Sequence, residues 1–389
     1  MAFGRVWVVR SGPQEAALHT AVSAPRIAVL IPDLSGGGAQ RVTTNLIAAL
    51  ATRGVKVDLL MVRAEGANLA RVPAEVRKIE LGTRRTLRSI PAVTAYLRQH
   101  RPQALLAVMD AAGVVAVVAR RLARVETRLV VVVHSATIMR ASAKIPWGEQ
   151  WLPVLLRSQL WPADAIVAVS DGVAEELRRV FPWLRRKVQM LYNPVVTKQL
   201  LQQAELVPDH PWLQQRAVPV ILGVGRLCAA KGFATLIRAF ATLAEQRPAR
   251  LIIYGDGELR HDLEALVAEL GLVDLVRLPG WTDNPWAALR QAALFALSSE
   301  YEALPTVLIE AMACGTPVVA TDCRFGPREV LRDGQLGPLV APRDPRALAH
   351  AMANTLEHPT PAAQLQARAA AFSDSACLDR YLGVLLGPQ

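Results

Sequence analysis

The chain alternates between apolar runs that suit buried strands and longer amphipathic segments that suit helices, and this alternation restricts its fold most strongly. The first unit has a predicted strand at Ile27–Ile31, the glycines Gly36-Gly37-Gly38, and an amphipathic segment at Ala39–Arg53. Gly54 ends that helix, and Val55–Val62 follows as the next strand. Because a strand, a glycine loop, a helix and a strand begin a doubly wound sheet, we predict an α/β protein.

The length of the chain predicts two domains, since 389 residues exceed what one ordinary core holds. Asn193-Pro194 is typical of a turn into a linker, and Val218–Gly223 is predicted to start a second sheet. We expect an N-terminal extension at residues 1–24, a first Rossmann-like domain at 25–194 and a second at 195–366. The last segment, 367–389, is predicted to be helical.

Two glutamates frame the predicted start of a helix in the stretch Ser298–Ala320. Pro305 suits the first helical position, where its missing N–H costs nothing, and Gly315 ends the helix. The free N–H groups and the positive dipole at such a start favour a phosphate. Glu302 precedes this start, and Glu310 lies about 7 Å beyond Pro305 along the axis. A diphosphate that joins a sugar to a ribose could meet both carboxylates; the alternative is a surface helix with two solvated acids.

A second loop carries two cations at a place that suits a diphosphate. Gly225–Gly232 follows the predicted strand Val218–Gly223 and precedes a predicted helix at Phe233–Leu243. Arg226 can grip a phosphate with two hydrogen bonds, and Lys231 adds a point charge. We interpret this loop as a diphosphate clamp, with ordinary surface cations as the alternative.

Two features of the first half lie at the same edge of its predicted sheet. His134 follows the strand Leu129–Val133, and ligands of such sheets bind outside the carboxyl ends of the strands. Gly37 and Gly38 let the backbone approach a ligand closely. Arg41 stands where the third glycine of a dinucleotide fingerprint belongs, which disfavours a nicotinamide enzyme. A structural histidine and a tight turn without a ligand are the alternatives.

Cysteine usage argues against a metal centre. The four cysteines are scattered, with no Cys-x-x-Cys spacing and no histidine cluster beside them. Neither a metal site nor a disulfide framework is expected, and a reducing compartment is the default. The early apolar run Val6–Val9 is too short for a signal peptide, and no apolar run suits a membrane span. We therefore expect a cytoplasmic protein.

The charge is divided unevenly between the halves. Residues 1–194 contain 27 lysines and arginines against 13 aspartates and glutamates, a net charge of +14. Residues 195–389 contain 17 against 20, a net charge of −3. Such a basic half suits an anionic membrane, an anionic lipid or nucleic acid, or serves only to keep the domain in solution. No nucleic-acid-binding motif accompanies it, so no nucleic-acid partner is predicted.

Two segments of the basic half suit an anionic membrane surface. One combines arginines with apolar residues, and the other, Pro146–Trp161, contains tryptophans, which favour the membrane–water boundary. The residues are Arg84, Arg85, Arg88, Arg98 and Arg101 with Leu87, Ile90, Val93 and Leu97, and then Trp147, Trp151 and Trp161. We expect any membrane contact to be peripheral and reversible, at the inner face of the cytoplasmic membrane.

In this order and spacing, the motifs resemble those of the bacterial retaining glycosyltransferases of family four, which have the GT-B fold. The resemblance covers nearly everything from Pro25 to Leu386. The matching pieces in the first half are Ser35–Arg41, His134, Ser170-Asp171-Gly172 and Asn193-Pro194. Those in the second half are Gly225-Arg226-Leu227, Lys231-Gly232, Gly255–Glu258, Leu278-Pro279-Gly280, Glu302–Pro305 and Glu310-Ala311.

The resemblance implies two Rossmann-like domains that face each other across a cleft, with a last helix that crosses back to the first domain. The acceptor would lie mostly on the first domain and the sugar nucleotide on the second. By this resemblance, Arg226 and Lys231 hold the diphosphate, and Glu310 holds the ribose hydroxyls. Catalytic roles fall to Glu302 and His134, and further donor contacts to Gly37, Gly38, Ala303, Leu304, Pro305 and Thr306. Ala303 stands where many members have glycine, which puts the donor preference in doubt.

The family also implies catalysis without a cofactor or a metal. The sequence contains no Asp-x-Asp motif, and the clamp and the helix dipole would stabilise the leaving diphosphate instead. The acceptor would attack the face from which the nucleotide leaves, with retention of configuration. We predict transfer from a nucleotide donor, UDP-linked, to a lipid-linked sugar or surface glycan, as in polysaccharide or lipopolysaccharide biosynthesis. The alternatives are a nucleotide-sugar epimerase or hydrolase on the same fold, and a non-catalytic protein that binds sugar nucleotides or lipids.

Overall fold

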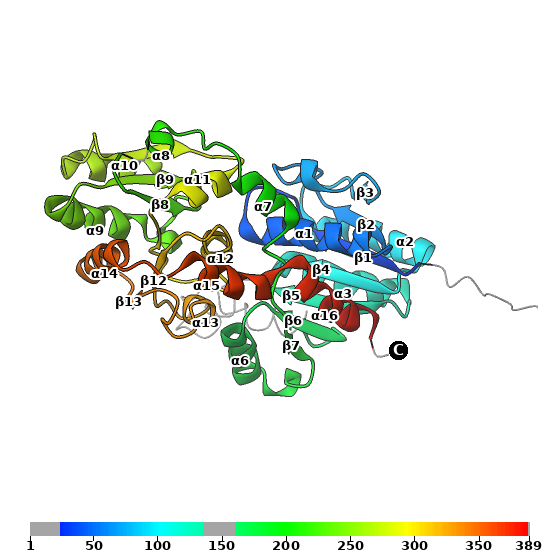
Figure 1. Cartoon of the computed structure of the whole chain (residues 1–389). Coiled ribbons are helices and arrows are strands. Elements are labelled where there is room, and N and C mark those ends of the chain that lie inside the picture. Colours follow the sequence, from blue (N-terminus) through cyan, green and yellow to red (C-terminus); the bar gives the residue numbers. More distant parts are fainter. Residues whose placement is uncertain (1–23, 135–159, 216, 388–389) are drawn as a thin grey trace, which may run out of the picture.

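The computed structural model describes residues 24–134, 160–215 and 217–387. In this part of the chain, two helix-flanked sheets lie next to each other (Figure 1). The first sheet has the order β3 (Arg77–Glu80), β2 (Lys56–Met61), β1 (Arg26–Ile31), β4 (Ala104–Val108), β5 (Arg128–Val133), β6 (Ala165–Ala168) and β7 (Val188–Met190). The second has the order β10 (Val276–Gly280), β9 (Arg250–Tyr254), β8 (Val220–Val224), β11 (Leu294–Leu297), β12 (Val318–Thr321) and β13 (Leu339–Val340).

The described strand pairs are parallel in both sheets, which confirms the predicted α/β class. Central strands read as apolar runs because helices cover both faces of a parallel sheet. In β1 and β5, for example, five of the six residues are buried. The edge strand β3 is mostly exposed and polar in sequence, which is why its pattern did not predict a strand.

Helices of the first half follow its strands in the expected rhythm. They are α1 (Gly38–Thr52), α2 (Ile90–His100), α3 (Asp110–Ala123) and α6 (Asp171–Val180). The predicted helix at Ala39–Arg53 corresponds to α1, which buries Leu46, Ile47 and Leu50. Because α1 begins directly after the glycine loop, its first turn lies at the carboxyl edge of the sheet, where ligands of such folds bind.

The second half repeats this rhythm. After β7 the chain forms α7 (Lys198–Ala204) and α8 (Pro211–Gln215), and the second sheet is flanked by the helices α9 (Phe233–Gln246), α10 (Arg260–Glu269), α11 (Pro285–Gln291), α12 (Thr306–Ala313), α13 (Pro327–Val330) and α14 (Pro345–Glu357). The central stretch of the sequence forms α12 and then β12, as predicted. Pro305 is the N-cap of α12 rather than its first residue, a shift of one position that leaves the helix start where it was expected.

The tail, which the sequence predicts to be helical, contains a break between two helices that the sequence did not suggest. Helix α15 (Ala362–Ala369) ends in a short 3-10 turn, and α16 (Asp374–Leu386) begins anew. Ser373 caps α16 by accepting a hydrogen bond from the Ala376 N–H at 3.2 Å. The Phe372 carbonyl accepts hydrogen bonds from the N–H groups of Val195 and Val196, which fixes the break. A helical pattern alone does not reveal this pairing with the linker.

Helix α16 packs on α1, β4 and β5 of the first half, after the chain has already formed the second sheet (Figure 1). One apolar cluster runs through this junction and includes Leu50, Val195, Leu308 and Phe372. This shared core holds the two halves together on one side and leaves a cleft between the carboxyl ends of the two sheets. The domain boundaries at 24, 194 and 366 stay predictions.

Candidate active site

A cleft of about 840 Å³ lies between the two halves. The predicted site residues that line it are Gly37, Gly38, His134, Arg226, Lys231, Glu302, Ala303, Leu304, Thr306 and Glu310. Pro305 is not among the lining residues and acts instead as the backbone cap of α12. The structure thus brings into one cavity residues that lie up to 273 positions apart in the sequence, from Gly37 to Glu310. The role assigned to each remains a prediction.

The glycine loop before α1 packs closely against the opposite half. A Cβ on Gly36 would lie 2.9 Å from the ring of Trp281, and a Cβ on Gly38 would lie 3.1 Å from Thr306 Oγ1. Gly37 has an extended backbone with φ −176°, so glycine is not required there by backbone conformation. The loop is glycine-rich because the backbone of one half must approach side chains of the other across the cleft.

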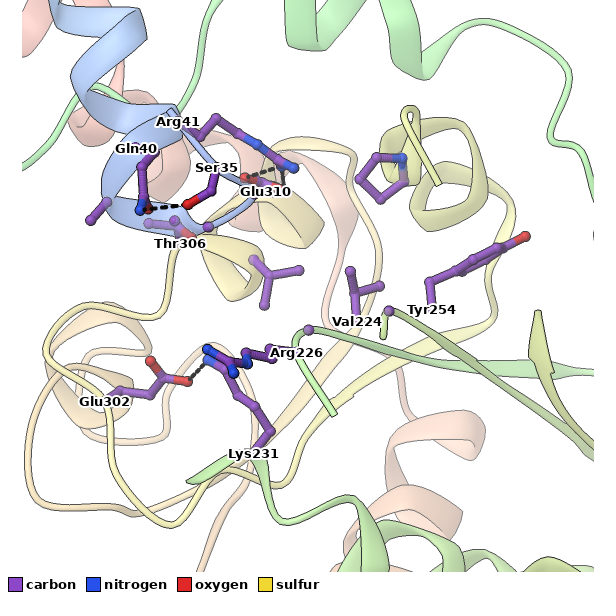
Figure 2. A pocket seen from close by; sticks show the side chains of 18 of the residues that line it. Ser35, Gln40, Arg41, Val224, Arg226, Lys231, Tyr254, Glu302, Thr306 and Glu310 are labelled. Atoms are coloured by element: carbon purple, nitrogen blue, oxygen red, sulfur yellow. Dashed lines mark hydrogen bonds and ion pairs between the residues drawn. The ribbon is translucent and has the colours of Figure 1, made fainter. Parts of the chain in front are cut away.

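The predicted clamp loop, Gly225–Gly232, holds Lys231 against Glu302. Lys231 Nζ donates to Glu302 Oε1 at 2.6 Å (Figure 2). Ser299 Oγ donates to the same oxygen at 2.7 Å. Burial lowers the pKa of Lys231, but the negative charge of Glu302 and the hydrogen bond between the two side chains raise it by more. The pKa of Lys231 therefore lies above its usual value. Gly232 follows with φ +61°, and a Cβ there would lie 2.2 Å from the Ser298 carbonyl oxygen. Lys231 is therefore a fixed cation.

Arg226 is more exposed to solvent than Lys231, the other cation of the predicted clamp. Its side chain is 73% exposed and pairs with Glu258 Oε2 at 3.3 Å. The Lys231 side chain is only 25% exposed. Both line the cleft, but Lys231 is already held, whereas Arg226 belongs to a surface ion pair of the kind that contributes little.

Glu310 is held from two sides inside the cleft. Arg41 Nη1 lies 3.1 and 3.2 Å from its two carboxylate oxygens (Figure 2). Trp286 Nε1 donates to Oε2 at 2.9 Å. The side chain of Glu310 is 3% exposed. Sequence reasoning missed both partners of Glu310: Arg41 was noted as the end of a family-matching loop and as a departure from a dinucleotide fingerprint, with no role assigned, and Trp286 belongs to no recognised motif.

His134 lies at the end of β5 and lines the cleft, half-buried. Burial lowers its pKa to about 4. Removal from water disfavours the charged imidazolium, so the ring is neutral at pH 7. A neutral imidazole can donate one hydrogen bond and accept another, but it supplies no charge to the cleft.

Two further contacts join the halves beside the loop that precedes α12. Ser170 Oγ donates to the Ala303 carbonyl oxygen at 2.7 Å, while the Asp171 N–H donates to the Glu329 carboxylate at 3.0 and 3.2 Å. Burial is the main cause that raises the pKa of Glu329. Ala303 does not adopt the left-handed backbone region, so the alanine that replaces the usual glycine imposes no backbone strain there.

The structure changes which residues of the two predicted membrane-facing segments can contact a lipid surface. Val93 and Leu97 are buried in the core of the first half, so these two cannot contact a lipid surface. Leu87 is 56% exposed, next to the exposed Arg85 and Arg88. Trp161 is 55% exposed, whereas Trp147 and Trp151 lie outside the described residues. Among the described helices, none is long and apolar enough to cross a membrane.

Comparison with known families matches both halves of the chain. The model for Glycosyl transferases group 1 matches residues 212–372, and the model for Glycosyltransferase Family 4 matches residues 36–199. The match to residues 212–372 contains every strand of the second sheet, and the match to residues 36–199 contains the strands of the first sheet except β1. Together they contain every residue that lines the cleft except Ser35.

Curated relatives share part of their length with this chain. One is the N-acetylgalactosamine-N,N'-diacetylbacillosaminyl-diphospho-undecaprenol 4-alpha-N-acetylgalactosaminyltransferase of Campylobacter jejuni, 38% identical over 188 residues, which are 48% of this chain and 49% of that protein. Another is the lipopolysaccharide core biosynthesis glycosyltransferase LpsE of Rhizobium meliloti, 33% identical over 227 residues, 57% of this chain and 64% of that protein. The chain spans about half the length of the curated relatives it matches.

Solved structures confirm the predicted GT-B fold over nearly the whole chain. Anabaena Alr3699/HepE in complex with UDP and glucose has a TM-score of 0.76 at 20% identity, covering 93% of this chain and 99% of that one. The sucrose-phosphate synthase of Thermosynechococcus elongatus has a TM-score of 0.76 at 23% identity, covering 92% and 98%. At such identities the likeness concerns the fold.

Proposed function

The chain belongs to the glycosyltransferases of group 1, and on that premise we propose that it transfers a sugar from a UDP-linked donor to a lipid-linked or surface-glycan acceptor. The reaction would retain the anomeric configuration and need no metal. The observation that carries this proposal is the arrangement of charge around the first turn of α12. Lys231 and Glu302 lie at one end of it, and Glu310 lies one to two turns further along.

The donor fits this arrangement in one orientation. The first N–H groups of α12 have no partner within the helix, and Thr306 and Val307 of that turn line the cleft. With Lys231 beside them, they form a positive end suited to a diphosphate. Glu302 would then face the sugar and Glu310 the ribose. As the glycosidic bond breaks, the helix dipole and Lys231 would stabilise the leaving nucleoside diphosphate in the place of a metal ion.

The nucleotide is proposed to be UDP. Anabaena Alr3699/HepE, which shares the fold, is described in complexes with UDP, with UDP-glucose, and with UDP and glucose. The cleft of this chain is roomy enough for such a ligand, since drug-sized and cofactor ligands occupy pockets of about 300–1,000 Å³.

A lipid-linked acceptor is proposed from the first half. The relatives described above are named for a diphospho-undecaprenol-linked sugar and for lipopolysaccharide core biosynthesis. The net charge of +14 in residues 1–194 and the exposed side chains at Leu87, Arg84, Arg85 and Arg88 suit an anionic membrane surface. The protein would then work at the inner face of the cytoplasmic membrane, held there peripherally.

A donor screen tests the proposal. The purified chain is heated with each of a panel of nucleotide sugars and the free nucleotides, and a shift in Tm is scored. A ligand that binds the native state alone adds about 2.7 kcal/mol of stability at a hundredfold excess over Kd. We expect UDP and one or more UDP-sugars to stabilise it, equally in EDTA. No stabilisation by any of them would overturn the proposal.

Product analysis separates transfer from the other reactions of this fold. The donor that binds is incubated with and without lipid-linked glycans, and the released sugar is identified. Donor that is consumed only when an acceptor is present supports a transferase, and an α-linked product from an α-linked donor supports retention. Conversion of the donor without an acceptor would indicate a hydrolase or an epimerase instead.

A further inference from the structure

Arg41 reaches across the cleft from the first half and pairs with the carboxylate of Glu310 in the second. A single nitrogen, Nη1, serves both carboxylate oxygens, at 3.1 and 3.2 Å. This differs from the strongest arginine–carboxylate pairs, in which two nitrogens meet two oxygens in parallel. The two side chains are 17% and 3% exposed, so the pair is largely withdrawn from water.

The described part of the protein leaves one hydrogen-bond donor of the Arg41 side chain without an acceptor. Its Nε is buried and has no hydrogen-bond partner within the residues that the structure describes. A buried donor without an acceptor is costly, and such a group in a native structure calls for a partner from outside the chain. Arg41 lines the cleft, so a ligand in the cleft can provide that partner.

The surroundings of the pair fix its geometry. Trp286 Nε1 donates to Glu310 Oε2 at 2.9 Å, and the Arg41 guanidinium carbon lies 5.3 Å from the centroid of the Trp286 ring. The Arg71 guanidinium carbon lies 5.1 Å from the centroid of the same ring, and Arg71 Nη2 donates to the Asp283 carbonyl oxygen at 3.2 Å. Two guanidinium groups therefore share the neighbourhood of one carboxylate, which favours a further hydrogen-bond acceptor beside them.

On the basis of the proposed nucleotide-sugar function, we propose that Arg41 is a nucleotide-binding residue supplied by the first half. Its Nε–H donates to an oxygen of the ribose, while its Nη1 keeps the Glu310 carboxylate turned toward the ribose hydroxyls. The ribose is then held by both halves at once. Donor binding consequently joins the halves across the cleft, and Arg41 adds a ribose contact to the donor contacts predicted for Gly37 and Gly38 of the same half.

Calorimetric titration of two ligands tests this assignment. The ligands are UDP and 2′,3′-dideoxy-UDP, which lacks the ribose hydroxyls. The variants are Arg41→Ala and Arg41→Lys, with Arg53→Ala as the control. Arg53 follows the other end of the same helix and loses an equal charge from an exposed pair with Asp379. Each Kd is measured for both ligands in all four proteins.

We expect Arg41→Ala to raise the Kd for UDP about ten- to hundredfold and Arg53→Ala to leave it unchanged. The unmodified chain should bind UDP more tightly than the dideoxy ligand, and the ratio of the two Kd values should fall toward one in Arg41→Ala. Arg41→Lys keeps the charge but loses the Nε–H, so the same fall in the ratio is expected. Because that ratio is read within one protein, it is insensitive to a general loss of stability.

Two results would overturn the assignment while leaving the proposed function intact. One is an Arg41→Ala variant with the UDP affinity of the unmodified chain. The other is an equal loss of affinity for both ligands in Arg41→Ala and Arg41→Lys, which would make Arg41 part of the scaffold only. Failure of the unmodified chain to bind UDP would instead overturn the UDP donor, and this inference with it.

Discussion

Lys231 and Glu302 are paired with each other in the cleft, with 2.6 Å between Nζ and Oε1, although they are proposed to meet different parts of the donor. Their side chains are 25% and 10% exposed. Ser299 donates to the same carboxylate oxygen, so Glu302 would keep a partner if Lys231 turned to the phosphate that it is proposed to bind. The pair holds both charges in place, which would reduce the reorganisation that the proposed donor binding requires.

We predict that Lys231→Ala weakens UDP binding by about 1.5–3 kcal/mol, the usual cost of a lost charged hydrogen bond. Arg226→Ala should weaken it too, but by less, because the Arg226 side chain is 73% exposed and its charge is screened by water. Calorimetric titration of both variants gives the order. Arg238→Ala, an exposed arginine on α9, is the control. UDP affinity that is unchanged in both variants would contradict the clamp.

Substitution of the two glutamates should change different kinetic constants. We predict that Glu302→Gln mainly lowers kcat, since Glu302 is proposed to face the reacting sugar, and that Glu310→Gln mainly raises KM, since Glu310 is proposed to face the ribose. A contact made equally in the ground state and the transition state affects KM, whereas one made only in the transition state affects kcat. Steady-state kinetics with the donor found in the screen measures both constants. Wild-type kcat and KM in both variants would make the stretch around α12 structural.

How far the sequence predicts this site depends on the kind of residue. The glycine loop before α1 and Glu302 before α12 each precede the start of a helix, so their place at the carboxyl edge of a sheet follows from local pattern. The ion pair between Arg41 and Glu310 joins residues 269 positions apart, and no local pattern encodes it. The same holds for the break at Phe372, which depends on pairing with Val195 and Val196.

Burial is the second limit of sequence reasoning. In the segment after β3, arginines alternate with apolar residues, and the sequence suggested a membrane-facing surface. The helix α2 turns Val93 and Leu97 inward, where they pack in the core, and only Leu87 remains exposed among the arginines. An amphipathic segment has an apolar face in either case, and only the tertiary structure decides whether protein or lipid covers it.

We predict a pH dependence of stability that comes from His134. Burial lowers its pKa to about 4, whereas the unfolded chain titrates near the ordinary value of 6.5. Between these pH values, His134 is protonated in the unfolded state and neutral in the native state. The contribution of His134 to the free energy of unfolding is therefore fully present above pH 6.5 and is lost as the pH falls toward 4. At 1.36 kcal/mol per unit, about 2 kcal/mol should be lost between pH 6.5 and 5.

Comparison with His134→Gln isolates this effect, because the other titrating groups are common to both proteins. Urea unfolding at pH 7 and at pH 5 gives the two free energies of unfolding for each protein. The unmodified chain should lose about 2 kcal/mol more than the variant on going to pH 5. Parallel losses in the two proteins would show that His134 titrates normally, and that it is accessible to water.

The last prediction concerns docking of the first half on an anionic membrane. Arg84, Arg85 and Arg88 are exposed around Leu87, and each basic residue near an anionic surface contributes on the order of 1 kcal/mol. The effect fades within a Debye length of about 8 Å at physiological salt. We expect the protein to sediment with vesicles that contain anionic lipid at low salt, to be released at high salt, and to ignore neutral vesicles. Replacing the three arginines by alanine should weaken binding about tenfold or more.

A second triple variant, Arg238→Ala/Arg332→Ala/Arg346→Ala, removes the same charge from exposed positions of the second half and should sediment like the unmodified chain. If both triple variants lose binding equally, net charge rather than this surface attracts the protein to the vesicles. If the unmodified chain sediments equally with anionic and neutral vesicles, or with neither at low salt, electrostatic docking is wrong. The acceptor would then have to reach the cleft without help from the membrane surface, while the donor site around α12 would be unaffected.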